Sequence, residues 1–189
     1  MACPSSRNGP IGRLREISIP VNWTTVLVGL AESSPPETPP TPQDVIDFAI
    51  GQIAAGVKPP EDVLVIAGAS PMDMDLLVSA VRRLAALESA ELSAEHRKWR
   101  LLAVCDVVAT LPADPLYALL ALTEFWAALG FPPDMPHVVQ GRGNTVSPFD
   151  YFTEANLERE VLRHRSWIDA EVESLRSPSD STVRSSTTP

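Results

Sequence analysis

Residues 91–111, ELSAEHRKWRLLAVCDVVATL, contain neither Gly nor Pro and form a segment too long for a single β-strand. Within this segment Trp99, Leu102, Cys105 and Val108 recur every third residue, which is close to the helical period. The pattern predicts a central α-helix with these four side chains on its buried face. A sheet would need a strand in this part of the chain, so the segment favours an all-α fold.

Helix-start signals recur on both sides of this central segment. Three of them place a Ser or Thr before a Pro, with an Asp two residues after the Pro. The hydroxyl can cap free N–H groups, Pro suits the first helical position, and the carboxylate interacts favourably with the helix dipole. Two further starts combine Pro with an acidic residue. These signals predict helices beginning at Pro42, Glu61, Pro71, Pro115 and Pro148.

Apolar residues at helical spacing follow most of these starts and predict the inward faces of the helices. The last helix is predicted over residues 148–175, and the helix before it is predicted to end at Gly130 as a left-handed cap. We therefore predict an all-α bundle of about five to six helices. The predicted inward residues of the first two helices are Val45, Ile46, Ala49 and Ile53, and Leu77, Ala80, Val81, Leu84 and Leu87.

Two segments leave alternatives open. Residues 17–28 are rich in β-branched side chains and fit either a short N-terminal strand pair or a short helix. Residues 63–68 fit a buried strand that enters a helix, which makes an α/β fold the alternative to the all-α bundle.

Composition predicts one domain with less ordered ends. Residues 1–15 are interpreted as a flexible leader, 16–176 as a single helical domain, and 31–40 as a Pro-rich connector within it. Residues 177–189 are almost wholly Ser, Thr and Pro, which predicts a disordered tail. No stretch has the roughly 20 apolar residues of a membrane span. Cys3 and Cys105 do not suggest a disulfide framework, so we expect a cytoplasmic protein.

The formal net charge of −9 argues against a protein that binds nucleic acid or coats an anionic membrane. Most of this charge falls within residues 32–75, where eight carboxylates accompany Lys58 alone. A surface of one sign attracts an oppositely charged partner and raises its encounter rate. We therefore expect a protein partner with a basic surface. The candidate binding residues in this stretch are Asp44, Asp47, Asp73 and Asp75.

A second candidate region is the long connection over residues 131–146. Long connections in compact domains are often functional, and this one is polar. Its candidate binding residues are Asp134, His137, Arg142 and Asn144. If these side chains converge on a pocket, the protein is an enzyme or a small-ligand-binding protein.

No complete catalytic or cofactor motif is found. Gly68 to Met72 lacks the second Gly of a nucleophile elbow, so Ser70 is interpreted as a helix cap. Glu160 and His164 are four residues apart, but no third metal ligand is placed by spacing, and a solvated helix pair is favoured. Asp106 is expected to pair with an Arg of the basic segment near Trp99. We predict no catalytic residue, no metal and no cofactor.

Three short motifs are spread along the chain: Trp23 with Gly29-Leu30, Lys98-Trp99, and Gly130-Phe131-Pro132-Pro133-Asp134-Met135. Together they resemble a bacterial family known only as a domain of unknown function. The resemblance covers most of residues 21–175, although Gln140 to Gly143 departs from the family's aromatic and Pro-rich continuation. It implies a small cytosolic helical domain without an established activity, and some relatives of this type resemble immunity partners of toxins.

Taken with the acidic stretch, these observations favour a non-enzymatic protein-binding domain over an enzyme. In its narrower form this hypothesis is an immunity protein that engages a basic toxin. The alternatives are the enzyme or ligand-binding protein that uses residues 131–146, and an oligomeric structural module. The oligomeric state is left open.

Overall fold

The computed structural model describes residues 3, 9–31, 39–56 and 58–176. In this part of the chain the protein is all-α, with nine helices and no strand, which confirms the predicted fold class. The number of helices exceeds the predicted five to six because several of them are short. The helices are α1 (Pro10–Glu16), α2 (Trp23–Leu30), α3 (Pro42–Ala54), α4 (Glu61–Ala67), α5 (Met74–Ala85), α6 (Leu92–Ala109), α7 (Pro115–Ala128), α8 (Pro148–Tyr151) and α9 (Glu154–Arg176).

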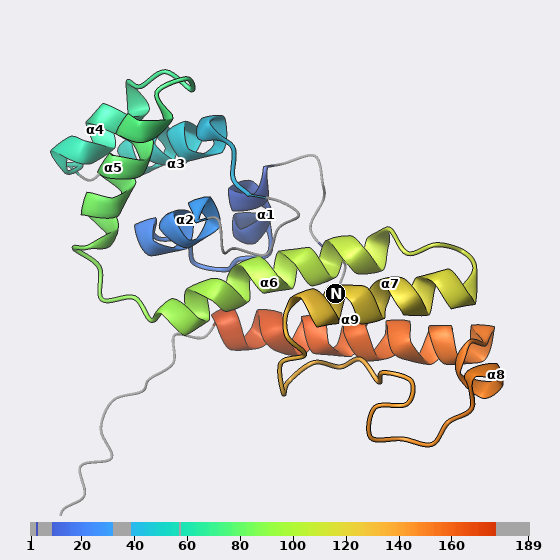
Figure 1. Ribbon diagram of the computed structural model, residues 1–189. Helices are drawn as coiled ribbons and strands as arrows, with labels where there is room; N and C mark the ends of the chain where they lie inside the picture. The colour runs from blue at the N-terminus through green and yellow to red at the C-terminus, as the bar shows by residue number, and fades with distance from the viewer. Residues whose placement is uncertain (1–2, 4–8, 32–38, 57, 177–189) are drawn as a thin grey trace, which may run out of the picture.

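The helices form two groups that share α6 (Figure 1). On one side α6 packs along α9 and α7, and the three helices lie alongside one another. On the other side α6 contacts α2 and α1, and α3, α4 and α5 complete this group. The central role predicted for residues 91–111 is therefore confirmed.

Most predicted helix starts are confirmed, because the capping bonds that the sequence offers are made. Thr41 Oγ1 accepts a hydrogen bond from Asp44 N (3.2 Å). Ser147 caps α8 in the same way, and Asp114 caps α7. The predicted start at Pro71 is wrong. Ser70 Oγ instead accepts from Met72 N (3.2 Å) in a turn, and α5 begins at Met74.

Both segments that left alternatives open contain helix and no strand. Residues 63–68 fall in α4 and its C-cap, so the α/β alternative is wrong. The N-terminal strand pair is also wrong, because Trp23–Leu30 is helix α2 with Asn22 as its N-cap. The Asn22 side chain accepts from Thr25 N and the Thr25 hydroxyl accepts from Asn22 N, a reciprocal cap that outweighs the β propensity of the segment.

Two predicted boundaries also need correction. The flexible leader expected over residues 1–15 contains α1 from Pro10 onward, and Ile11 and Leu14 of this helix are buried. The single helix expected over 148–175 is divided into α8 and α9. The tail expected at 177–189 lies outside the described residues, as does most of the connector expected at 31–40.

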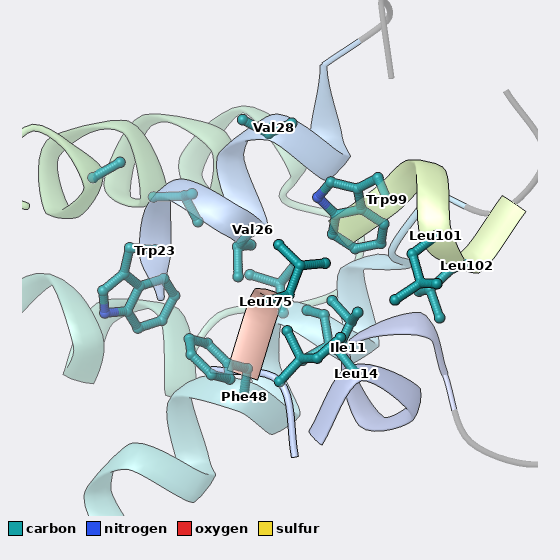
Figure 2. Packing of buried hydrophobic residues seen from close by; sticks show 14 of the residues in the cluster. Ile11, Leu14, Trp23, Val26, Val28, Phe48, Trp99, Leu101, Leu102 and Leu175 are labelled. Carbon is teal, nitrogen blue, oxygen red and sulfur yellow. The ribbon is translucent and has the colours of Figure 1, made fainter. Parts of the chain in front are cut away.

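The main core gathers apolar side chains from both helix groups (Figure 2). Trp23 of α2 meets Phe48 of α3 edge to face, with ring centroids 4.8 Å apart. Leu101 and Leu102 of α6 are buried in the same cluster, and Leu175 near the end of α9 also joins it. The last helix is therefore fixed to the N-terminal helices as well as to α6.

Close contact between α2 and α6 depends on Gly29. A Cβ atom at this position would lie 2.3 Å from Cζ2 of Trp99, so only Gly lets the indole pack against the backbone of α2. Trp99 Nε1 donates to the carbonyl of Thr25 (2.8 Å), which fixes the ring along the helix. Beside it, Lys98 and Glu95 form a buried ion pair (2.7 Å) that Thr25 also contacts.

Asp106 on α6 is paired, but not with the expected neighbour. Its partner is Arg13 of α1, whose Nη1 donates to Asp106 Oδ2 (2.9 Å), rather than an Arg of the basic segment near Trp99. The side chain of Arg13 is almost fully buried. Arg13 was not considered as the partner because residues 1–15 were interpreted as a flexible leader.

Among the residues that the structure describes, no helix is both long and apolar enough to cross a lipid bilayer.

Candidate functional site

The acidic residues of α3 lie next to α1. Asp44 occupies the first turn of α3, where its carboxylate accepts from Thr41 N (2.7 Å). Asp47 accepts from the side-chain amide of Gln43 (2.8 Å). Both line a hollow of about 200 Å³ to which Arg15 of α1 contributes. These two carboxylates therefore have partners or a nearby cation within the chain.

The acidic residues of α5 are different. Asp73 and Asp75 belong to residues 72–76, Met-Asp-Met-Asp-Leu, which we call the 72–76 surface, and all five residues are exposed. Asp73 is the N-cap of α5, yet its side chain makes no capping hydrogen bond. Met72 is 88% exposed, Met74 41% and Leu76 43%. Carboxylates and large apolar side chains thus alternate along one exposed segment.

The four candidate residues of the 131–146 connection do not meet in one pocket. Asp134 forms an ion pair with Arg100 of α6, with Oδ1 3.0 Å from Nη1. The guanidinium of Arg142 stacks over the ring of Phe131, 4.1 Å from its centroid. Asn144 donates to the carbonyl of Val139 (2.7 Å) and so closes a turn. Each of these contacts holds the connection in shape.

His137 is the exception, because it enters the protein interior. Its Nδ1 lies 3.1 Å from Oε2 of Glu160 on α9, and neither side chain is exposed to solvent. The same Glu160 oxygen accepts from the backbone N–H of Val138 (3.2 Å), and Oε1 accepts from Arg163 (2.5 Å). Burial alone would raise the pKa of Glu160. The hydrogen bonds from His137 and Val138 outweigh this effect, so the pKa lies below its ordinary value.

Hydrogen bonds hold both ring nitrogens of His137. Its Nε2 lies 2.9 Å from Thr123 Oγ1 on α7, and the same hydroxyl contacts the carbonyl of Leu119 (2.9 Å). Tyr151 donates to the carbonyl of Val138 (2.6 Å), and burial raises the pKa of Tyr151 to about 12. With Nδ1 at Glu160, His137 thus joins α7 to α9.

His164, one turn further along α9, is neutral. Its Nε2 accepts from the indole N–H of Trp126 (2.9 Å), which can only donate. Its Nδ1 therefore carries the proton and donates to the carbonyl of Glu160 (2.7 Å). Burial lowers the pKa of His164, in agreement with a neutral ring. The network thus places a neutral His164 next to the buried Glu160.

These residues bind the connection to α7 and α9. General acid–base catalysis needs a group within hydrogen-bond reach of a substrate, and the side chains of His137 and Glu160 have no exposed surface. Within the described residues, no three His, Cys, Asp or Glu side chains are arranged to hold a metal ion. The arrangement is suited to anchoring a long loop.

The solvated pair predicted for Glu160 and His164 is wrong, because both residues are fully buried. A signal that could have shown their burial is present in α9. Glu160 and His164 continue the four-residue spacing of the buried residues Ile168 and Val172, so all four lie on the inward face. Polar residues in phase with a core stripe indicate a buried network.

Fold and site together define an all-helical domain centred on α6, with a buried histidine–glutamate network that anchors its longest connection. The chain belongs to the family described as "Uncharacterized protein conserved in bacteria (DUF2247)", whose model matches residues 12–172. The match runs from α1 into α9. No curated protein and no solved structure matches the chain.

The structure gives physical reasons for the motifs that carry the family resemblance. Gly29 and Trp99 form the close contact between α2 and α6. Gly130, with φ of +72°, ends α7, and the N–H of Phe131 then bonds to the carbonyl of Trp126 (2.9 Å). Asp134 pairs with Arg100. All of these motif residues stabilise the fold.

Proposed function

We propose that this protein is a non-enzymatic binding domain that uses the 72–76 surface to engage a partner protein with a basic surface. The single observation that carries the proposal is the alternation of Met72, Asp73, Met74, Asp75 and Leu76 at exposed positions. Solubility and helix capping could account for the carboxylates alone. They do not account for two methionines and a leucine exposed between them.

The chemistry of this segment fits a protein partner. Methionine is flexible and polarizable, so it adapts to irregular apolar surfaces and is frequent at binding sites. The carboxylates of Asp73 and Asp75 have no hydrogen-bond or ion-pair partner among the described residues, and their charges remain available to an incoming cation. Asp62, in contrast, is paired with Arg83 (2.5 Å) and its charge is largely compensated.

Asp44 and Asp47 have a supporting role in this proposal. They add to the negative potential on the same helix group, since α3 contacts α4 and α4 contacts α5. Long-range attraction raises the rate of encounter, whereas the apolar side chains of the 72–76 surface determine how long the complex lasts. We therefore expect substitutions at Asp44 and Asp47 to change the association rate constant more than the dissociation rate constant.

Affinity capture from lysate of the native cells tests the proposal. The tagged protein is compared with the variant Asp73→Lys/Asp75→Lys and with Met72→Ser/Met74→Ser, at low and high salt. The matched control is Glu154→Lys/Glu158→Lys, which makes the same charge change in the exposed first turns of α9. We expect a basic protein to be captured by the wild type and the control, but not by the Asp variant. Capture of the same proteins by the wild type and the Asp variant would contradict the proposal.

The narrower form of the proposal is an immunity role, in which the basic partner is a toxin. Co-expression with toxic products of adjacent genes tests it through cell survival. The wild-type protein and the α9 control are expected to protect the cells, whereas Asp73→Lys/Asp75→Lys is expected to fail. Equal protection by all three proteins would exclude the 72–76 surface from such a role.

A further inference from the structure

α5 and α6 carry six basic side chains, and four of them are already paired with carboxylates. The other two are Arg82 of α5 and His96 of α6. Their side chains form no hydrogen bond or ion pair within the part of the chain that the structure describes. These two groups therefore keep their capacity to bind an anion. The four ion pairs are Arg83–Asp62, Arg97–Glu171, Lys98–Glu95 and Arg100–Asp134.

Arg82 and His96 line the same hollow, which has a volume of about 350 Å³ and which we call the α2–α5–α6 hollow. α2 contacts both α5 and α6, so residues far apart in the sequence meet here (Figure 1). Among the described residues that line the hollow, Arg82 and His96 alone have polar side chains. The walls are aliphatic and consist of Leu27, Val28, Leu30, Ala31, Val78 and Leu92.

This combination of walls and basic groups selects a ligand with an aliphatic body and an anionic head. The Arg82 guanidinium presents several N–H donors in a geometry that matches a carboxylate, and a ring N–H of His96 can add another hydrogen bond. An ammonium ligand would be repelled by Arg82. An uncharged lipid would bury aliphatic surface in the hollow but would gain nothing from the guanidinium charge.

We propose that the α2–α5–α6 hollow binds a medium-chain fatty acid in its carboxylate form. The carboxylate lies between Arg82 and His96, and the hydrocarbon chain lies against Leu27, Leu30 and Val78. A volume of about 350 Å³ is near the lower end of the range for ligand sites, about 300–1,000 Å³, and therefore fits a medium chain better than a long one. The hollow shares no residue with the 72–76 surface, so this site does not depend on the proposed function.

The test is an NMR titration of the folded full-length protein with octanoate, followed through the backbone amide signals. We expect saturable shift changes at residues around the hollow, such as Val78 and Leu92, with a Kd below about 1 mM. 1-Octanol has the same chain without the charge and should bind at least about tenfold more weakly. Acetate has the head without the chain and should cause no saturable change at the same concentrations.

Three variants test the position of the carboxylate. Arg82→Gln removes a charge at an exposed position, so the fold should stay intact. We expect it to weaken octanoate binding at least about tenfold and to leave octanol binding unchanged. Arg83→Gln is the matched control, because this adjacent residue loses the same charge but pairs with Asp62 outside the hollow. It should change the octanoate affinity less than about twofold. His96→Ala removes one donor and should weaken octanoate binding about threefold.

The proposal is overturned if octanoate causes no saturable change at the residues that line the α2–α5–α6 hollow. It is also overturned if octanol binds as tightly as octanoate, or if Arg82→Gln and Arg83→Gln weaken octanoate binding equally.

Discussion

Nδ1 of His137, in the connection between α7 and α8, lies 3.1 Å from Oε2 of Glu160 on α9, and both side chains are closed to solvent. A buried charge is costly unless it is paired and hydrogen-bonded, and here three groups surround the Glu160 carboxylate. The bonds from Val138 and Arg163 complete the set around Glu160. This contact ties the chain's long connection to its longest helix.

The first prediction concerns this contact. Glu160→Gln keeps the size of the side chain but removes the buried negative charge that His137, Val138 and Arg163 surround. We expect the free energy of unfolding to fall by about 3 kcal/mol in urea denaturation. Arg163→Ala is the control, because Arg163 is 48% exposed and its loss should cost less than about 1 kcal/mol. Equal losses of unfolding free energy in Glu160→Gln and Arg163→Ala would show that the buried His137–Glu160 pair does not hold the 131–146 connection.

The second prediction is a pH dependence of stability. Burial lowers the pKa of His164 below its ordinary value of 6.5, so the unfolded chain binds the proton more readily than the folded chain. Stability should therefore decrease as the pH falls below about 6.5, by at most about 1.4 kcal/mol per pH unit for this one proton. The lowered pKa of Glu160 adds a further loss at more acidic pH, below its ordinary value of 4.5. Urea denaturation between pH 7.5 and pH 5 measures the first effect.

His164→Gln provides the comparison for this pH dependence. The Gln side chain offers an oxygen to the Trp126 N–H but does not titrate. We expect lower stability at pH 7.5 by about 1–2 kcal/mol, together with a shallower decrease toward pH 5. If the free energy of unfolding of His164→Gln changed with pH as steeply as that of the wild type, other groups would be the cause of the pH dependence.

The third prediction uses two helical glycines that differ in their surroundings. Gly29→Ala would place a Cβ 2.3 Å from the Trp99 ring and should lower the free energy of unfolding by about 2–3 kcal/mol. Gly51→Ala in α3 meets only the flexible end of Arg15, at 3.3 Å, and should be neutral or stabilising by up to about 1 kcal/mol. Thermal unfolding of both variants checks this. Similar losses at both positions would contradict the close packing of α2 on α6.

The fourth prediction compares two arginines of α1. Arg13→Ala removes the buried guanidinium that pairs with Asp106 and should lower the free energy of unfolding by about 3 kcal/mol. Arg15→Ala, at an exposed position in the same helix, should cost less than about 1 kcal/mol. If urea denaturation showed no difference between these variants, α1 would not be held to α6 by this ion pair.

Local signals were sufficient to predict the fold class and most helix boundaries. The start of α3 at Pro42 and the end of α7 before Gly130 depend on capping groups within a few residues, and such groups can be recognised in the sequence. The start of α5 was mispredicted because the Ser70 hydroxyl can cap either a turn or a helix. Its hydroxyl caps a turn at Met72 in the fold, where the sequence equally allowed a helix cap.

The candidate site was predicted less well, because it depends on contacts between distant residues. His137 was recognised as a polar residue in a long connection, but its partner Glu160 was expected in solvent. Arg13 and Asp106 lie in helices that meet only through tertiary packing. A buried charge needs a partner. The sequence does not show which residue supplies it, because that depends on which helices pack together.

The most direct test of the proposed function is the affinity of the purified partner for this protein, measured by isothermal titration calorimetry at two salt concentrations. We predict that Asp73→Lys/Asp75→Lys weakens binding at least about tenfold and removes most of its salt dependence, while Glu154→Lys/Glu158→Lys leaves both unchanged. Equal affinities and equal salt dependence for the wild type and both variants would contradict a partner bound at the 72–76 surface.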